Sequence, residues 1–198
     1  LAGIAPESDV RLRRFPRAAA DLERAARLIA GAPDLVEQDG LPNARGQPTS
    51  TLHTNVWYHL GLVRFCQADF PAAVAAFDAC LAASRNPDME SAARYWLYLS
   101  ARRAGRVERA ARVLAAVDPA WDIIENHAYY QLLLLFRGDL VELPRTAGGP
   151  DPVQDATRAF GLANHLLFRG DRAGALALLQ ELAARGSAAF GCIAAEEQ

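Results

Sequence analysis

Trp57-Tyr58-His59-Leu60-Gly61 is followed by Ala68-Asp69-Phe70, and then by Ala73 and Phe77. We expect two helices here, at 55–67 and 71–84, on either side of a turn that begins at Ala68. In steps of 37, 33 and 32 residues (105−68, 138−105 and 170−138), the same turn recurs at Gly105, Gly138 and Gly170. A repeat of about 34 residues predicts stacked helical hairpins.

The composition allows a sizeable core. The chain has 198 residues, of which 52% are hydrophobic, and this suits one compact domain or one continuous solenoid. Charged residues make up 22%, the net charge is −2 and the isoelectric point is about 6.1. This balance argues against binding to nucleic acid or to an anionic membrane surface, which requires a basic face. No apolar run approaches the roughly 20 residues of a membrane-spanning helix, so we expect no membrane span.

Residue usage points to an origin. Every basic residue apart from the histidines is an arginine, and the predicted helices are rich in alanine. This usage is typical of a GC-rich bacterial genome. We favour the bacterial cytoplasm, with the periplasm as the alternative if a signal peptide preceded Leu1.

The chain is predicted to form a single helical repeat domain over residues 1–198. We divide it into a partial repeat at 15–30, a loop at 39–54, hairpins at 55–84, 89–117, 122–143 and 154–185, and a C-terminal cap at 186–198. The hairpin at 122–143 is degenerate. A long helix is expected at 122–137, but Pro144 and the breakers at 148–152 leave its second helix short or irregular. A short last helix is expected from Ser187.

The first complete hairpin resembles a tetratricopeptide repeat. The family has a pattern of seven positions: Trp, Leu, Gly, an aromatic residue, Ala, a second aromatic residue and a small residue. In this chain these positions hold Trp57, Leu60, Gly61, Phe70, Ala73, Phe77 and Cys80. Weaker matches follow in the second hairpin (Leu97, Val107, Ala110, Leu114) and the last (Leu162, Ala163, Ala175, Leu179, Leu182). Residues 39–61 are also similar to a stretch of some uncharacterised bacterial tetratricopeptide proteins. The resemblance implies an all-α, right-handed superhelical solenoid of antiparallel helix pairs.

The resemblance also implies a function. Proteins of this family generally bind a protein or peptide along a concave groove lined by the first helix of each hairpin, so we expect a non-catalytic scaffold or adaptor. Carrying the groove positions over residue by residue gives Asn55, Tyr58, Tyr95, Arg102, Arg103 and Asn164. Aromatic and arginine side chains contribute strongly to binding, and two adjacent arginines favour an acidic peptide. The alternative is that both tyrosines pack between repeats and that the arginines form a solvated face.

The loop at 39–54 directly precedes the first groove helix and is rich in Gly, Pro, Ser and Thr. Loops of this length in compact domains are often functional. Its candidates for closing one end of the groove are Asn43, Arg45 and His53. The alternative is that the loop only covers hydrophobic surface between hairpins.

The sequence carries no recognised catalytic or metal-binding motif. No H-E-x-x-H, G-x-S-x-G, P-loop or G-x-G-x-x-G pattern occurs. We therefore expect no enzyme, no metal and no cofactor. A second hypothesis is an enzyme or small-ligand-binding domain with a site near the 39–54 loop, Glu125 and His127, and it predicts an enclosed polar pocket there. A third is a homo-oligomer that associates through an exposed terminal hairpin.

Overall fold

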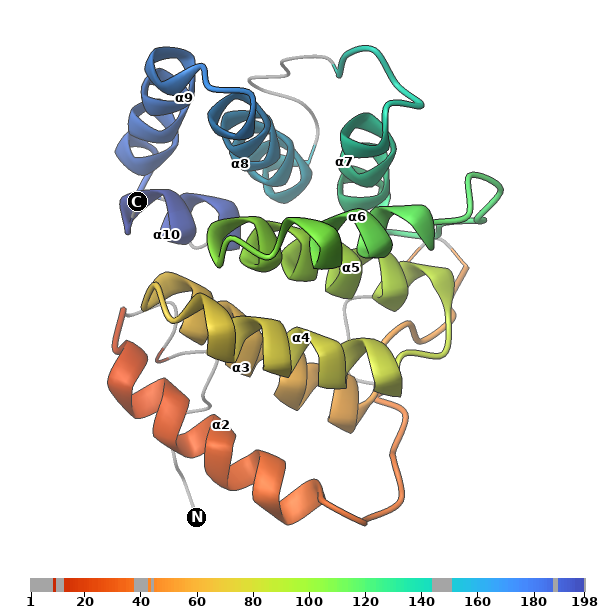
Figure 1. The fold of residues 1–198 in the computed structure, drawn as a ribbon. Helices are drawn as coiled ribbons and strands as arrows, with labels where there is room; N and C mark the ends of the chain where they lie inside the picture. The colour runs from red at the N-terminus through yellow and green to blue at the C-terminus, as the bar shows by residue number, and fades with distance from the viewer. Residues whose placement is uncertain are drawn as a thin grey trace.

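The computed structural model describes residues 9, 13–37, 43, 45–143, 151–186 and 189–197, and within them the chain is all-α. Nine helices occur in these residues, packed in sequential pairs, which confirms the predicted class and the hairpin order. They are α2 Phe15–Ile29, α3 Leu52–Cys66, α4 Phe70–Ala83, α5 Pro87–Arg103, α6 Val107–Ala115, α7 His127–Arg137, α8 Pro152–Phe168, α9 Arg172–Ala184 and α10 Phe190–Glu196. Figure 1 shows them in layers, from α2 at one end to α8 and α9 at the other.

The recurring turn has the same backbone conformation each time. Ala68, Gly105, Gly138 and Gly170 all have positive φ, at 57°, 71°, 94° and 90°. A left-handed residue just after a helix turns the chain back and satisfies the last carbonyl groups of that helix. Glycine adopts this conformation without steric cost, whereas the Cβ of Ala68 makes it unfavourable.

Side-chain caps set where most helices begin. Asp69, Asn86, Asp151 and Asp171 each accept a hydrogen bond from a backbone N–H in the first turn of α4, α5, α8 and α9. Thr51 and Thr54 form a reciprocal capping box that starts α3 at Leu52. The predicted loop therefore ends three residues earlier than expected, and His53 lies in the first turn of α3 rather than in a loop.

The third hairpin differs from its prediction. Residues 122–126 are not helical, and α7 begins only at His127. Residues 140–143 form no second helix, while Pro144 and residues 148–150 lie outside the described residues. The last helix begins at Phe190, and Ser187, where it was expected to begin, also lies outside the described residues. Within the described residues that follow α7, 138–143, the expected second helix of this hairpin is therefore absent.

Trp96 on α5 lies at the centre of the core. Its indole is 1% exposed and lies 5.2 Å from the Phe65 ring, 6.3 Å from Phe77 and 5.6 Å from Phe160, which belong to α3, α4 and α8. The indole N–H also donates to the Tyr58 hydroxyl at 3.1 Å. Four helices therefore meet on one side chain, which was not among the predicted packing positions.

Trp57 and Gly61 flank the face of α3 that meets its neighbours. Trp57 is only partly buried and packs on a second, smaller cluster of Ala26, Ile29 and Val56. Gly61 faces the Phe77 ring, where a Cβ atom would lie 2.6 Å from the ring carbons. The close approach of α3 and α4 thus requires a residue without a side chain at position 61.

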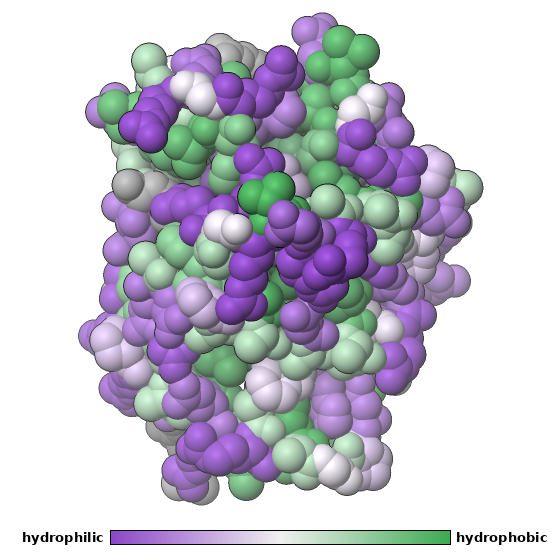
Figure 2. Space-filling model, viewed as in Figure 1, coloured by the Kyte–Doolittle hydropathy of each residue, from purple (hydrophilic) through white to green (hydrophobic). Residues whose placement is uncertain are grey.

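The surface is mixed in character. In the face shown in Figure 2, hydrophilic side chains surround small apolar areas. The exposed large apolar residues are Leu28, Leu35, Val36, Val107, Val141, Val153 and Leu176. Across the described part of the chain, no helix combines the length and apolar character that crossing a bilayer requires.

Replacing Trp96 with phenylalanine is expected to lower the free energy of unfolding by about 2–3 kcal/mol, because it leaves a cavity and removes the N–H that satisfies the Tyr58 hydroxyl. The matched variant Trp57→Phe is expected to lose less than about 1 kcal/mol, since its indole is partly in solvent. Urea denaturation followed by circular dichroism measures both. Equal losses would contradict the central position of Trp96.

Replacing Ala68 with glycine is expected to raise the free energy of unfolding by about 0.5–1 kcal/mol, because relief of the left-handed strain exceeds the added entropy of the unfolded chain. Ala104 is the control, since it occupies a neighbouring turn with φ −78°. Ala104→Gly has no strain to relieve and is expected to destabilise by about 0.4–1 kcal/mol. Thermal unfolding of the two variants should therefore shift in opposite directions.

Candidate functional site

The C-terminal helix covers the inner side of the helix stack. α10 packs on α8 and α9 and also reaches α3, and Figure 1 shows it lying beneath α8 and α9. Five of its seven residues are buried. Arg13 donates to the Glu196 carboxylate at 2.6 Å, which ties the start of the described chain to its end. The inner helices are therefore not left open to solvent.

Between these elements lies a cavity of about 280 Å³, which we call the central pocket. Its walls come from α3, α5, α7, α8 and α10 and from the two segments that precede α3 and α7. Its lining residues are Thr49, Ser50, Asn55, Tyr58, His59, Met89, Ala92, Glu125, Asn126, Ala128, Tyr129, Val153, Gln154, Thr157 and Phe190. Such a mixture of apolar walls and a few polar groups is typical of ligand-binding sites.

Asp88 holds the segment that carries Glu125. Its carboxylate is 1% exposed and accepts from the backbone N–H groups of Ile124, Glu125 and Asn126 at 2.8–2.9 Å. The Asn126 side chain donates back to the Asp88 carbonyl at 3.1 Å. A carboxylate on α5 therefore orders the non-helical residues before α7, which explains why the helix does not begin at residue 122.

Gln154 of α8 fixes the same segment from the other side. Its amide oxygen accepts from the Ala128 N–H at 2.8 Å, and its amide nitrogen donates to the Glu125 carbonyl at 2.7 Å. The hydroxyl of Thr49 donates to the Glu125 carboxylate. Main chain and side chain of Glu125 are thus both held, and the carboxylate is placed at the wall of the central pocket.

Two tyrosines form a hydrogen-bonded pair in the pocket. The hydroxyls of Tyr58 and Tyr129 lie 2.8 Å apart, and Tyr58 also accepts from Trp96. Burial, and then the neighbouring Tyr129, raise the pKa of the Tyr58 phenol well above its ordinary value. Tyr58 therefore stays a neutral hydrogen-bonding group at physiological pH.

Aromatic rings cover another part of the wall. The Phe190 ring from α10 lies 5.7 Å from His59 and 6.5 Å from Tyr58, both edge to face. The described residues that line the pocket include one carboxylate, Glu125, and no arginine. The pocket therefore combines negative charge with aromatic rings.

The predicted groove residues lie in different places. Asn55 and Tyr58 line the central pocket, as does Glu125 of the second hypothesis. Tyr95 and Asn164, by contrast, are 0% and 2% exposed, so neither presents a surface to a partner in this structure. The Asn164 amide donates to the Phe160 carbonyl at 3.0 Å, and Tyr95 packs between Trp96, Tyr129 and Phe136. For these two residues the packing interpretation replaces the binding one.

Arg102 and Arg103 do not form a paired cationic site. Arg102 lies 4.3 Å over the Phe168 ring at the end of α8 and donates to the Tyr98 hydroxyl. Arg103 lies 4.6 Å over the Phe70 ring of α4, and burial lowers its pKa. Consecutive residues of a helix point about 100° apart, and here they reach different neighbours. The expected joint binding of an acidic peptide therefore has no geometric basis.

The loop candidates mainly order the loop. Asn43 accepts from the N–H groups of Arg45 and Gln47, and the Arg45 guanidinium pairs with Asp122 at 2.5 and 2.7 Å, which lowers the pKa of that carboxyl. The backbone N–H of His53 donates to Asp34. None of the three predicted loop residues lines the central pocket, and His127 is exposed outside it.

The loop ends are nevertheless close together and bound to the helices. Val36 and Thr51 form an isolated antiparallel bridge, and the Leu52 N–H donates to the Leu35 carbonyl at 2.8 Å. Asn86, in the turn before α5, donates to the Thr49 carbonyl at 2.8 Å. This anchoring explains how Thr49 and Ser50 reach the pocket although the predicted loop candidates do not.

Sequence reasoning missed the residues that build the pocket from a distance. Asp88 follows Asn86-Pro87, a pair that by itself indicates only a break in the chain, and Gln154, Tyr129 and Phe190 belong to no motif. The acidic residue in the first turn of α5 was the one available signal. Within the described ranges, no group of three or more His, Cys, Asp or Glu side chains is arranged to hold a metal ion.

Comparison with protein-family models, with curated proteins and with solved structures found no significant match.

Replacing Asp88 with asparagine is expected to lower the free energy of unfolding by about 1–3 kcal/mol, because an NH₂ group would then face backbone N–H donors. Asp78→Asn is the control, since Asp78 pairs with Arg109 in a partly solvated position and such pairs contribute less than about 1 kcal/mol. Urea denaturation measures both variants. A loss for Asp88→Asn no larger than for the control would show that the anchor is not needed.

Proposed function

We propose that this protein is a non-catalytic scaffold of the tetratricopeptide type, a superhelical solenoid that binds a protein or peptide partner from its inner face. Support comes from the sequential helix pairs, from the left-handed turn that recurs about every 34 residues, and from the resemblance around Trp57. A stack of this kind supplies a rigid surface, and the irregular segments between its helices supply specificity.

The central pocket is the recognition point of this proposal, and its chemistry selects a cation. Glu125 offers a carboxylate held by Thr49, and the aromatic rings of Tyr58, Tyr129 and Phe190 lie in the wall beside it. Arginine, lysine and amino groups are bound by such combinations of carboxylate and aromatic ring. This carboxylate, set in an aromatic pocket without an arginine, is the observation that carries the proposal.

The position of α10 limits how a partner binds. Because α10 occupies the inner face beside α3 and α8, an extended peptide has no continuous channel there. A single basic side chain or an N-terminal ammonium group fits a cavity of about 280 Å³. The partner would therefore insert one residue and make its remaining contacts at the rim formed by residues 49–50 and α8.

A second candidate function is binding of a small cationic molecule. The small volume of the pocket, about 280 Å³, favours it, because a small ligand needs no path along the helix stack. This second candidate uses Glu125, as the enzyme or small-ligand hypothesis from the sequence does, but it does not use His127, which lies outside the pocket. The two candidates share the same recognition chemistry and differ in the size of what is bound.

Selection from a random peptide library displayed on phage tests the main proposal. Enriched peptides are expected to carry arginine or lysine. Glu125→Gln should lower the affinity for a selected peptide by about tenfold to a hundredfold, since it removes a charge-assisted hydrogen bond. Glu108→Gln, on the exposed surface of α6, is the control and should leave the affinity unchanged.

Enrichment of acidic peptides, or equal binding by the Glu125→Gln variant, would contradict the proposal. If no peptide is enriched while an alkylguanidinium salt binds in calorimetry and loses affinity in Glu125→Gln, the small-molecule candidate replaces it. Folding of each variant is checked by circular dichroism, so that loss of structure is not mistaken for loss of binding.

A further inference from the structure

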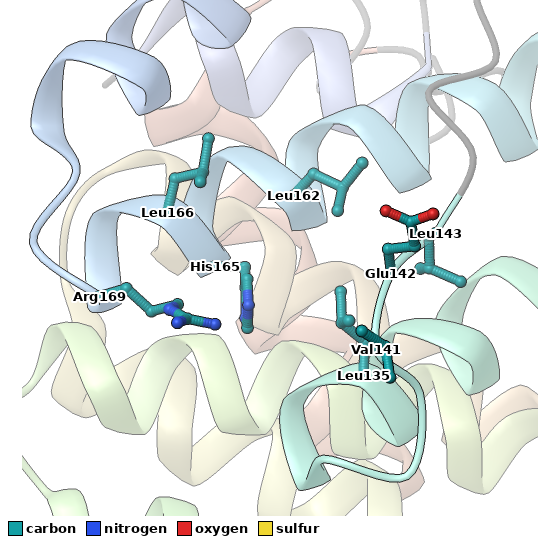
Figure 3. A pocket seen from close by; sticks show the side chains of 8 residues that line it. All are labelled: Leu135, Val141, Glu142, Leu143, Leu162, His165, Leu166 and Arg169. Atoms are coloured by element: carbon teal, nitrogen blue, oxygen red, sulfur yellow. The ribbon is translucent and has the colours of Figure 1, made fainter.

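A second cavity lies between α7 and α8, on the side away from the central pocket. Its volume is about 490 Å³, within the usual range of small-molecule sites. One wall is α8, and the other is the end of α7 together with residues 141–143. Figure 3 shows the side chains around it. No predicted site residue lines this cavity, and the proposed function does not use it.

The middle of the cavity is apolar. Leu135 of α7 and Leu143 of the following segment are buried, and Leu162 and Leu166 of α8 are partly buried. Figure 3 shows Leu162 and Leu135 between the two polar ends of the cavity. Contact between such side chains and an aliphatic chain removes apolar surface from water. The gain in free energy is about 25 cal/mol for each Å² buried.

One end of the cavity is positively charged. The backbone N–H of Arg169, which follows α8, donates to the His165 and Leu166 carbonyls, whereas its guanidinium makes no hydrogen bond or ion pair with the described residues. His165 lies beside it and stacks on the Phe136 ring at 5.7 Å. Burial, and then the charges of Arg169 and Arg102, lower the pKa of His165. Two guanidinium groups therefore act on this end, and within the described ranges neither forms an ion pair with a carboxylate.

The other end carries the opposite charge. Glu142 lines the cavity beside Leu143 and Val141, and Figure 3 shows it across the leucines from Arg169 and His165. An anionic head group is therefore repelled at one end and attracted at the other. The charges give the cavity a direction along which an elongated ligand would lie.

We propose that this cavity binds an aliphatic carboxylate, such as a medium-chain fatty acid. The carboxylate pairs with Arg169 beside His165, and the alkyl chain lies across Leu162, Leu135 and Leu166 toward Val141. Charge complementarity with an unpaired arginine selects the anion, and the leucines between the two ends select the aliphatic chain. This site is separate from the central pocket and does not depend on its role.

Isothermal titration calorimetry with sodium octanoate tests the proposal on the intact protein. Octanoate is expected to bind at least tenfold more tightly than 1-octanol, because octanol has the same alkyl chain without the charge. Arg169→Met should lower the affinity for octanoate about tenfold. Arg112→Met, the same substitution on the exposed surface of α6, should leave its affinity unchanged.

A spectroscopic measurement places the ligand. Octanoate should shift the imidazole proton resonances of His165 in an NMR titration, whereas those of His127, which is exposed outside the cavity, should not move. Octanoate and octanol binding equally, an unchanged affinity in Arg169→Met, or an undisturbed His165 would each overturn the proposal. Arg169 is exposed, so its replacement is not expected to affect folding.

Discussion

The position of the Trp96 indole is the constraint on which the arrangement of the helices depends. Rings from α3, α4 and α8 surround it, and its N–H donates to Tyr58, whose hydroxyl in turn contacts Tyr129 of α7. One side chain of α5 therefore relates four other helices to one another. Because these contacts include a buried hydrogen bond, they fix how far α3 is shifted along α5 as well as the distance between the two helices. The wall of the central pocket is a consequence of that arrangement.

The site arises where the repeat fails. Regular hairpins satisfy their backbone groups within the helices, whereas residues 122–126 have no helix to do so. The carboxylate of Asp88 and the amide of Gln154 take over that role from neighbouring helices and hold Glu125 at the pocket. The interruption of the repeat thus replaces a packing surface with a polar one. Side chains that are far away in sequence offset the loss of the hydrogen bonds that the missing helix would have supplied.

Prediction of the site succeeded in part, for reasons that individual residues show. Asn55 and Tyr58, which were expected to line a groove, line the central pocket, where Tyr58 is buried, and their contact with a partner stays a prediction. Tyr95 and Asn164 were expected at other groove positions, yet both are buried. Groove positions transferred from a repeat assume an open face, whereas Tyr95 packs against the rings of Trp96, Tyr129 and Phe136. Two arginines adjacent in sequence diverge because a helix turns about 100° at each residue.

The amino-acid sequence alone determined most of the helices, their sequential pairing and the positions of the turns at Ala68, Gly105, Gly138 and Gly170, because these depend on interactions within a few residues of the chain. The central pocket and the cavity beside Arg169 were decided by tertiary contacts only. The wall of the central pocket combines residues separated by most of the chain, such as Asn55 and Phe190. No local pattern encodes such a distance, since it follows from how whole helices pack against Trp96.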